Sequence, residues 1–250
     1  MAMLKSQFEE EWPPATPAVR LIVAAALDQE LAPLKSRSLP NLQLLKTGVG
    51  VENADRALRC CLEHARPQVV LGIGFAGGLS PKLRVGDVLL ARNVRGSSLT
   101  LVSAALLAAA AKISLDGTTI HFGTVITVNE ILGKASLKRS LAGSLESGEL
   151  GCVDMESLAI AQVCSEYRLP FLITRCITDG LDEDLPIDFD LCRKSDGSID
   201  TGNVLRSAFF RPQALPGLWQ LHKRSKYCAE NLALFVEKLL KLVAPGSASC

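Results

Sequence analysis

Carboxylic acids that could take part in catalysis stand at the ends of expected helices and strands. The stretch from Gly151 to Asp184 contains the triplet Asp154-Met155-Glu156 at the start of a helical pattern and Thr178-Asp179 at the end of an apolar strand pattern. Glu30 follows another apolar run near the start of the chain. Binding sites in α/β sheets collect polar groups at such ends, and carboxyl groups are common general acids and bases. We therefore expect chemistry at these positions.

Each of these residues also has an ordinary structural interpretation when it is considered alone. Asp154 and Glu156 suit the positive end of a helix dipole, and Asp179 suits a turn. Met155 would then be a core side chain and Glu30 a first-turn acid. Only the joint spacing of these residues with the motifs described below favours a site.

Apolar strands that alternate with helices must position the acids. Strands without polar alternation are typical of a sheet that is covered on both faces. The pattern predicts strands at 19–26, 42–46, 68–73, 85–91, 118–128, 152–153 and 170–177, and helices at 28–40, 51–65, 99–113, 136–145, 155–167 and 215–243. We predict one α/β domain over residues 18–245, a three-layer sandwich with a mixed, mostly parallel central sheet flanked by helices. A flexible arm is expected at 1–17, and a flap or insertion at 185–213.

A glycine-rich segment follows the expected strand at 68–73. Residues 72–78, G-I-G-F-A-G-G, match the dinucleotide-binding pattern formally. That fingerprint requires a helix starting inside the glycines and an acid about 20 residues later. Here Ser80-Pro81 intervenes, a strand follows, and Arg92 and Asn93 occupy the position of the acid. We interpret Gly74, Phe75, Ala76 and Gly77 instead as a loop whose backbone N–H groups a ligand can approach closely.

Composition narrows the classes of function. The net charge of +1 gives no electrostatic argument for binding nucleic acid. The eight cysteines form no C-x-x-C pair and have no metal-ligand spacing to a histidine, so we expect no metal. Three of them fall inside apolar runs, which is typical of reduced core thiols, and the acidic, proline-containing N-terminal residues do not resemble a signal peptide. We expect a cytoplasmic protein without a membrane-spanning segment.

Four motifs, in order, resemble the purine nucleoside phosphorylase superfamily. They are A-L-D-Q-E at 26–30, G-V-G-x-x-N-A at 48–54, G-x-A-G-G-L with V-G-D at 74–87, and D-M-E-S-x-A-x-A-x-V-C…P-F…R-x-I-T-D at 154–179. Within the superfamily the chain is most similar to 5'-methylthioadenosine/S-adenosylhomocysteine nucleosidases and their bacterial relatives, which include futalosine hydrolases and hopanoid-associated phosphorylase-like proteins.

The resemblance implies specific roles in cleavage of an N-glycosidic bond. Asp179 would donate a proton toward N7 of the leaving purine, and Glu30 would orient the attacking water. Glu156 would accept hydrogen bonds from the ribose hydroxyls, and Met155 would pack against the sugar. These residue types suit the reaction, because positive charge builds on the ribosyl ring and negative charge on the departing base.

The resemblance also implies supporting residues and an assembly. Arg175 and Thr178 would support the acids, and the backbone near Ile131 and Leu132 would lie against the base. The active protein would be a homodimer or a larger homo-oligomer. No cofactor is implied, although inorganic phosphate would be a co-substrate if the reaction were phosphorolytic.

The choice of nucleophile and of substrate is more open. Phe75 stands where a nucleosidase-like pattern has a hydroxyl residue, and Glu30 would repel phosphate, so we predict hydrolysis, with phosphorolysis as the alternative. A short link at 95–98, no aromatic residue near Ile131 and the segment at 185–213 distinguish the chain from methylthioadenosine enzymes. These features resemble the hopanoid-associated group, and that resemblance implies a purine nucleoside whose 5' modification is bulky or lipidic. A nucleoside-binding protein without catalysis is the alternative from another class.

Overall fold

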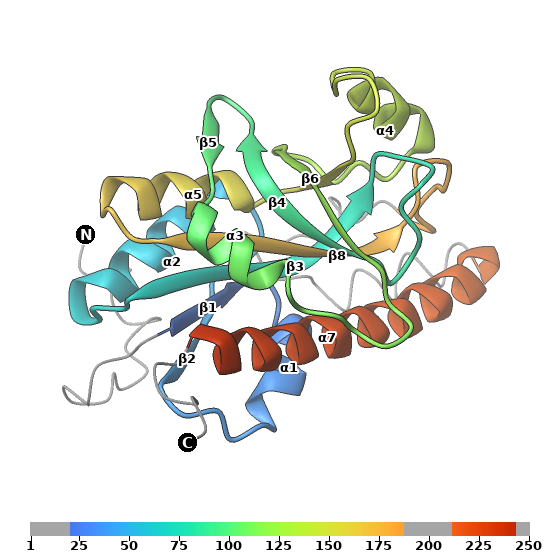
Figure 1. The fold of residues 1–250 in the computed structure, drawn as a ribbon. Helices are drawn as coiled ribbons and strands as arrows, with labels where there is room; N and C mark the ends of the chain where they lie inside the picture. Colours follow the sequence, from blue (N-terminus) through green and yellow to red (C-terminus); the bar gives the residue numbers. More distant parts are fainter. Residues whose placement is uncertain (1–20, 188–211, 244–250) are drawn as a thin grey trace, which may run out of the picture.

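Eight strands form one mixed sheet in the computed structural model, which describes residues 21–187 and 212–243 (Figure 1). The strands are β1 (Leu21–Ala25), β2 (Leu42–Lys46), β3 (Val69–Gly78), β4 (Val88–Arg95), β5 (Leu99–Leu101), β6 (Ile120–Thr127), β7 (Gly151–Asp154) and β8 (Phe171–Asp179). Five of their eight pairings are parallel. The predicted fold class, a mixed and mostly parallel sheet flanked by helices, is confirmed.

The sheet closes on itself, which the strand pattern alone did not predict. β3 pairs with β8, β8 with β4, β4 with β6, β6 with β7, and β7 returns to β3. The closure depends on the last residues of β3, because Gly77 and Gly78 pair with β7 while the preceding residues pair with β8. The register of the β3–β8 pair shifts between Ala76 and Gly77. A shift of this kind bends a strand, and the bend allows β3 to pair with both β8 and β7.

Helices cover the sheet. They are α1 (Asp28–Lys35), α2 (Val51–His64), α3 (Ala104–Ala110), α4 (Ala135–Ala142), α5 (Ser157–Glu166) and α7 (Leu215–Val243), with a 3-10 turn, η2, at Pro212–Ala214. α2 contacts α5, and α1 contacts α7. In Figure 1, α7 crosses below the sheet and α5 lies above it. The strands β1 and β8 between them are buried throughout, as their apolar sequences predict.

Two predicted elements were wrong in detail. The helix expected at 99–113 begins as a short strand, β5, because the edge of β4 offers backbone partners to residues 99–101. The helix starts only after Ser103, whose side chain accepts a hydrogen bond from the Leu106 N–H. The glycine segment expected as a loop is strand, since Gly74 to Gly78 pair with β8 and β7. The predicted arm at 1–17, and residues 188–211 of the predicted flap, lie outside the described residues.

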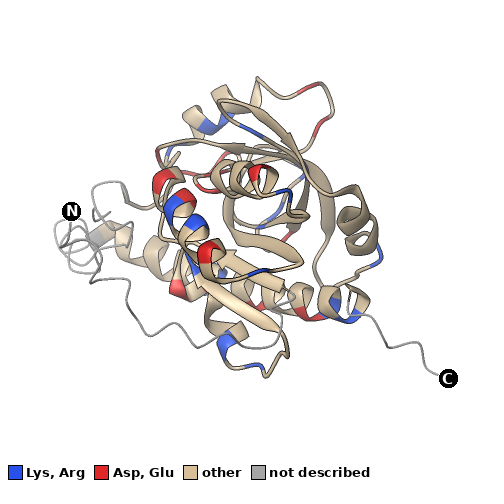
Figure 2. Ribbon diagram, turned by 90° about the vertical axis from the view of Figure 1, so that its left-hand side faces the viewer, with Lys and Arg blue, Asp and Glu red and all other residues tan. Residues whose placement is uncertain are grey.

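Charges are mixed along the described chain. Figure 2 shows acidic and basic residues next to one another on the helices that face the viewer. Arg59, for example, pairs with Asp55 in its own helix and with Glu166 at the end of α5. Among the helices of residues 21–187 and 212–243, none combines the length and apolarity needed to cross a membrane.

Candidate active site

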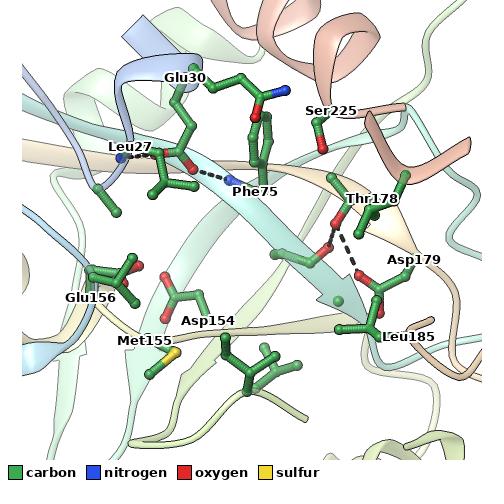
Figure 3. Close-up of a pocket in the computed structure, with 18 of the residues that line it drawn as sticks. Leu27, Glu30, Phe75, Asp154, Met155, Glu156, Thr178, Asp179, Leu185 and Ser225 are labelled. Atoms are coloured by element: carbon green, nitrogen blue, oxygen red, sulfur yellow. Dashed lines mark hydrogen bonds between the residues drawn. The ribbon is translucent and has the colours of Figure 1, made fainter. Parts of the chain in front are cut away.

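One cavity of about 710 Å³ opens where β1, β3, β7 and β8 end (Figure 3). Carboxyl ends of parallel strands are where α/β sheets bind ligands. Of the predicted site residues, the cavity is lined by Glu30, Phe75, Ala76, Gly77, Ile131, Leu132, Met155, Glu156, Thr178 and Asp179. Gly74 and Arg175 are not lining residues, and they lie behind the wall. In the view of Figure 3, Glu30 and Glu156 lie on one side of the cavity and Asp179 on the other.

Glu30 is held by two backbone N–H groups. It is the third residue of α1, and its Oε2 accepts a hydrogen bond of 2.8 Å from the N–H of Leu27, at the helix start. Its Oε1 accepts one of 2.8 Å from the N–H of Phe75 in β3. Burial raises the pKa of Glu30, while the nearby Arg175 and these backbone donors act in the opposite direction. The carboxyl group is therefore fixed in position between α1 and β3.

Arg175 lies at the centre of a buried charge cluster behind the cavity. Its Nε donates to Asp154 Oδ2 at 2.7 Å, and its Nη2 donates to Ser157 Oγ at 2.9 Å. Asp154 also accepts from Thr127 Oγ1 at 2.8 Å and from the Ser157 hydroxyl and N–H. Arg175 and Asp154 are each 1% exposed at their side chains. Arg175 thus neutralises Asp154 and remains close to the acids in the cavity.

Gly74 provides the space that the Arg175 side chain occupies. A Cβ atom at this position would collide with the guanidinium group and would lie 3.0 Å from Glu30 Oε1. Any larger residue would therefore displace the cation from between β3 and the acids. The structural role of Gly74 is to admit Arg175, and not to expose an N–H group to the cavity as the sequence suggested.

Glu156 faces the cavity just before α5. The helix begins at Ser157 and not at Met155, so both Met155 and Glu156 stand outside the helix. Glu156 Oε1 accepts a hydrogen bond of 2.8 Å from the N–H of Gly50, whose φ of 99° is one that glycine tolerates. Burial, and next the charge of Asp154, raise the pKa of Glu156 to about 8. Glu156 therefore holds a proton at neutral pH in the folded protein.

We expect Glu156→Gln to flatten the dependence of stability on pH. The unfolded chain releases the Glu156 proton above about pH 4.5, whereas the folded protein holds it up to about pH 8. The stability from this proton is fully present below the unfolded pKa and is lost as the pH rises through the folded pKa, by an amount on the order of 4 kcal/mol. Urea unfolding at about pH 5 and about pH 8 measures this, with the exposed Glu63→Gln as the control. Equal slopes in Glu156→Gln and wild type would contradict the expectation.

Asp179 lies at the end of β8 and is paired with a buried lysine. Lys138 Nζ donates to Asp179 Oδ2 at 2.6 Å and to the carbonyl oxygen of Gly180 at 2.5 Å. Thr178 Oγ1 donates to Asp179 Oδ1 at 3.0 Å. Burial raises the pKa of Asp179, and the Lys138 ammonium group partly opposes that rise. The pKa of Asp179 is raised overall, because the carboxyl group is almost fully buried.

Apolar residues form the remaining walls. Met155 packs with Ala26 and Val49, and Ile131 packs against this cluster. Leu185, Leu218 and Leu221 close another part of the cavity. The last two belong to α7, more than 180 positions after Glu30, and no pattern in the sequence predicts that this helix contributes to the site. Lys138 was likewise not predicted, because only its contact with the distant Asp179 reveals it, and the pairing of Asp154 with Arg175 was not predicted either.

The cavity has few basic side chains in its lining. Its lining includes two basic side chains, those of Lys46 and His222, and Lys46 Nζ is bonded to Asp28 at 2.8 Å. Arg92 stacks over the ring of Phe122, 5.8 Å from its centroid. Within the described part of the chain, no group of three His, Cys, Asp or Glu residues could hold a metal ion.

Comparisons with known proteins identify relatives over most of this region. A family model described as the phosphorylase superfamily matches residues 41–205. The 5'-methylthioadenosine/S-adenosylhomocysteine nucleosidase of Geobacillus kaustophilus (strain HTA426) is 32% identical over 170 residues, which cover 59% of this chain and 70% of that protein. The nucleosidase of the same name from Exiguobacterium sp. (strain ATCC BAA-1283 / AT1b) is 26% identical over 174 residues, 61% of this chain and 74% of that protein.

Solved structures share the fold at lower identity. The 5'-methylthioadenosine/S-adenosylhomocysteine nucleosidase of Neisseria meningitidis, solved with methylthio-immucillin-A, superimposes with a TM-score of 0.67 at 18% identity, covering 89% of this chain and 98% of that chain. The futalosine hydrolase of Helicobacter pylori strain 26695 does so with a TM-score of 0.67 at 15% identity and the same coverage. Because the family model matches more than half of the chain and a relative shares 32% identity, the chain belongs to the phosphorylase superfamily.

Proposed function

We propose that the protein hydrolyses the N-glycosidic bond of a purine nucleoside that carries a 5' modification. The observation that carries this proposal is the placement of three buried acids, Glu30, Glu156 and Asp179, around one cavity, with Asp179 on the side opposite the other two in Figure 3. An acid on the side of the base and carboxyl groups on the side of the sugar match the charges of glycosidic cleavage. The names of the relatives, all nucleosidases or hydrolases, point to the same reaction class.

In the proposed reaction the bond between the purine N9 and the ribose C1' breaks, and its electron pair leaves with the base. Asp179 gives its proton to N7 of the base, for which its raised pKa is suited. Water attacks C1' and transfers a proton to Glu30. Glu156 binds the ribose hydroxyls beside Met155, which packs against the sugar.

The contacts of Phe75 favour water over phosphate as the nucleophile. A phosphorylase must hold a dianion with donors or cations. The Phe75 N–H is already bonded to Glu30, and Lys46 is already paired with Asp28. The Glu30 carboxyl group at the same wall also repels an anion when it is ionised. Phosphorolysis is the second candidate, and the basic His222 at the cavity wall is the feature that would favour it.

The apolar wall supports a 5' group with a sizeable apolar part. Leu185, Leu218 and Leu221 offer such a group a surface of hydrocarbon in a cavity of about 710 Å³. The base, the identity of the 5' group, the homo-oligomeric assembly and the cytoplasmic location stay predictions.

Release of free base from a panel of nucleosides tests the proposed function. We expect the purified protein to release base from at least one 5'-modified purine nucleoside without phosphate, measured by chromatography. Adenosine and inosine serve as unmodified comparisons. A strict requirement for phosphate would replace hydrolysis by phosphorolysis. Tight binding in calorimetry with no base released over long incubation would favour the nucleoside-binding protein without catalysis.

A further inference from the structure

Lys138 is a fully buried lysine whose ammonium group meets the proposed acid. Its side chain is 0% exposed, although it lies on α4, a helix that carries polar residues on its outer face. Its Nζ bonds to Asp179 Oδ2 at 2.6 Å and to the Gly180 carbonyl at 2.5 Å. Burying a lysine is costly unless its charge is paired, so this side chain needs Asp179.

Gly77 in β3 leaves room for the Lys138 side chain. A Cβ atom on Gly77 would lie 3.2 Å from Asp179 Oδ2 and 3.5 Å from Lys138 Cδ. Gly77 lines the cavity, whereas Lys138 does not. Lys138 therefore contacts the Asp179 carboxyl group from outside the cavity lining.

The remaining charged groups near Asp179 are few in the described chain. Glu183 raises the pKa of Asp179 by its charge, but it also accepts a hydrogen bond from Arg224. Asp184 bonds to Lys134 at 2.8 Å and to the Ala135 N–H. Lys138 is thus the cation in direct contact with Asp179, and Thr178 is its neutral hydrogen-bond partner.

We propose that Lys138 is a positioning residue for Asp179: its ammonium group fixes the orientation of the carboxyl group and limits the pH range over which the carboxyl group holds a proton. This inference rests on the proposed function, in which Asp179 is the acid. Because the ammonium group occupies Oδ2 while Oδ1 accepts from the neutral Thr178 hydroxyl, Oδ1 is the oxygen on which a proton is less opposed. A neighbouring positive charge favours the ionised carboxylate, so Lys138 makes Asp179 release its proton more readily than burial alone would allow.

Lys138→Met tests the inference through the pH profile of base release. Without the cation, the pKa of Asp179 rises, so the loss of kcat/KM at high pH should move upward by at least about one pH unit. The value of kcat/KM at the optimum should fall by about tenfold or more, because the carboxyl group is no longer held in place. Lys138→Arg keeps a cation beside Asp179, so its kcat/KM should fall at the same high pH as in wild type. The exposed Lys134→Met, at the N-cap of the same helix, is the matched control.

Calorimetric binding of adenine gives a second readout that needs no turnover. A protonated Asp179 donates a hydrogen bond to the base, so adenine binding should weaken at high pH. In Lys138→Met, the pH at which adenine affinity falls should be higher than in wild type. If wild type releases no base from any nucleoside but the fall in adenine affinity still shifts to higher pH in Lys138→Met, the proposed reaction is wrong and the Lys138 inference stands. The inference would be overturned by a folded Lys138→Met protein in which kcat/KM and adenine affinity both fall at the same pH as in wild type.

Discussion

Asp179→Asn is expected to lower kcat/KM for base release by about 10²- to 10⁴-fold, the range attributed to general acid–base catalysis. The asparagine amide keeps the size of the side chain and can still accept from Lys138 or Thr178, but it has no acidic proton to give to the departing base. The loss should appear mainly in kcat, because the missing interaction is one that forms as the bond breaks.

At pH values where Asp179 is ionised in the wild type, the variant also leaves Lys138 as a buried cation without its counter-charge. Breaking a buried ion pair in this way costs on the order of 3 to 5 kcal/mol of stability. The double variant Asp179→Asn with Lys138→Met removes this cost, so it should be more stable than Asp179→Asn and equally inactive. Recovery of activity in the double variant would show that instability, and not the missing acid, caused the loss.

A surface carboxylate, Asp182, provides the control for the effect of Asp179→Asn on activity. Asp182 is 67% exposed and pairs with Arg139, so Asp182→Asn should keep nearly full activity. Asp179→Asn with activity close to that of Asp182→Asn would remove Asp179 from the role of acid.

The sequence predicted the acids better than it predicted what surrounds them. Glu30, Glu156 and Asp179 stand at element ends within recognisable motifs, and the structure brings all three to one cavity. The cavity, however, depends on the closure of the sheet through Gly77 and Gly78, which pair with a strand more than 70 residues later. Local patterning carries no information on such a pairing.

Long-range partners explain the other omissions. Lys138 has the sequence context of a surface residue on a short helix, and only its contact with Asp179 reveals its burial. Leu218 and Leu221 follow an ordinary amphipathic spacing, which fixes the faces of α7 but not the element against which they pack. The strand at Leu99–Leu101 was missed because its partner, the edge of β4, outweighs the helical preference of the residues that follow.

Arg175→Met is expected to destabilise the fold strongly. The guanidinium group is 1% exposed, pairs with Asp154 at 2.7 Å and favours the ionised forms of Glu30 and Glu156, whose pKa values it lowers. Its removal leaves a buried carboxylate, Asp154, without a cation, which costs on the order of 3 to 5 kcal/mol. Methionine fills much of the same volume, so the loss reports charge more than packing.

The loss of stability in Arg175→Met, relative to wild type, should grow with pH. At low pH the carboxyl groups near Arg175 are protonated and need no counter-charge. Arg175 lowers the pKa of Glu30 and of Glu156, so without it both pKa values rise and ionisation of either group becomes more costly. Urea unfolding at about pH 5.5 and about pH 8 should therefore give a larger difference from wild type at the higher pH. Arg139→Met, at a side chain that is 54% exposed, should change stability by less than about 1 kcal/mol at either pH. A deficit in Arg175→Met that is the same at both pH values would mean that the residue acts through packing and hydrogen bonds to Ser157, and not as the counter-charge of the acids in the cavity.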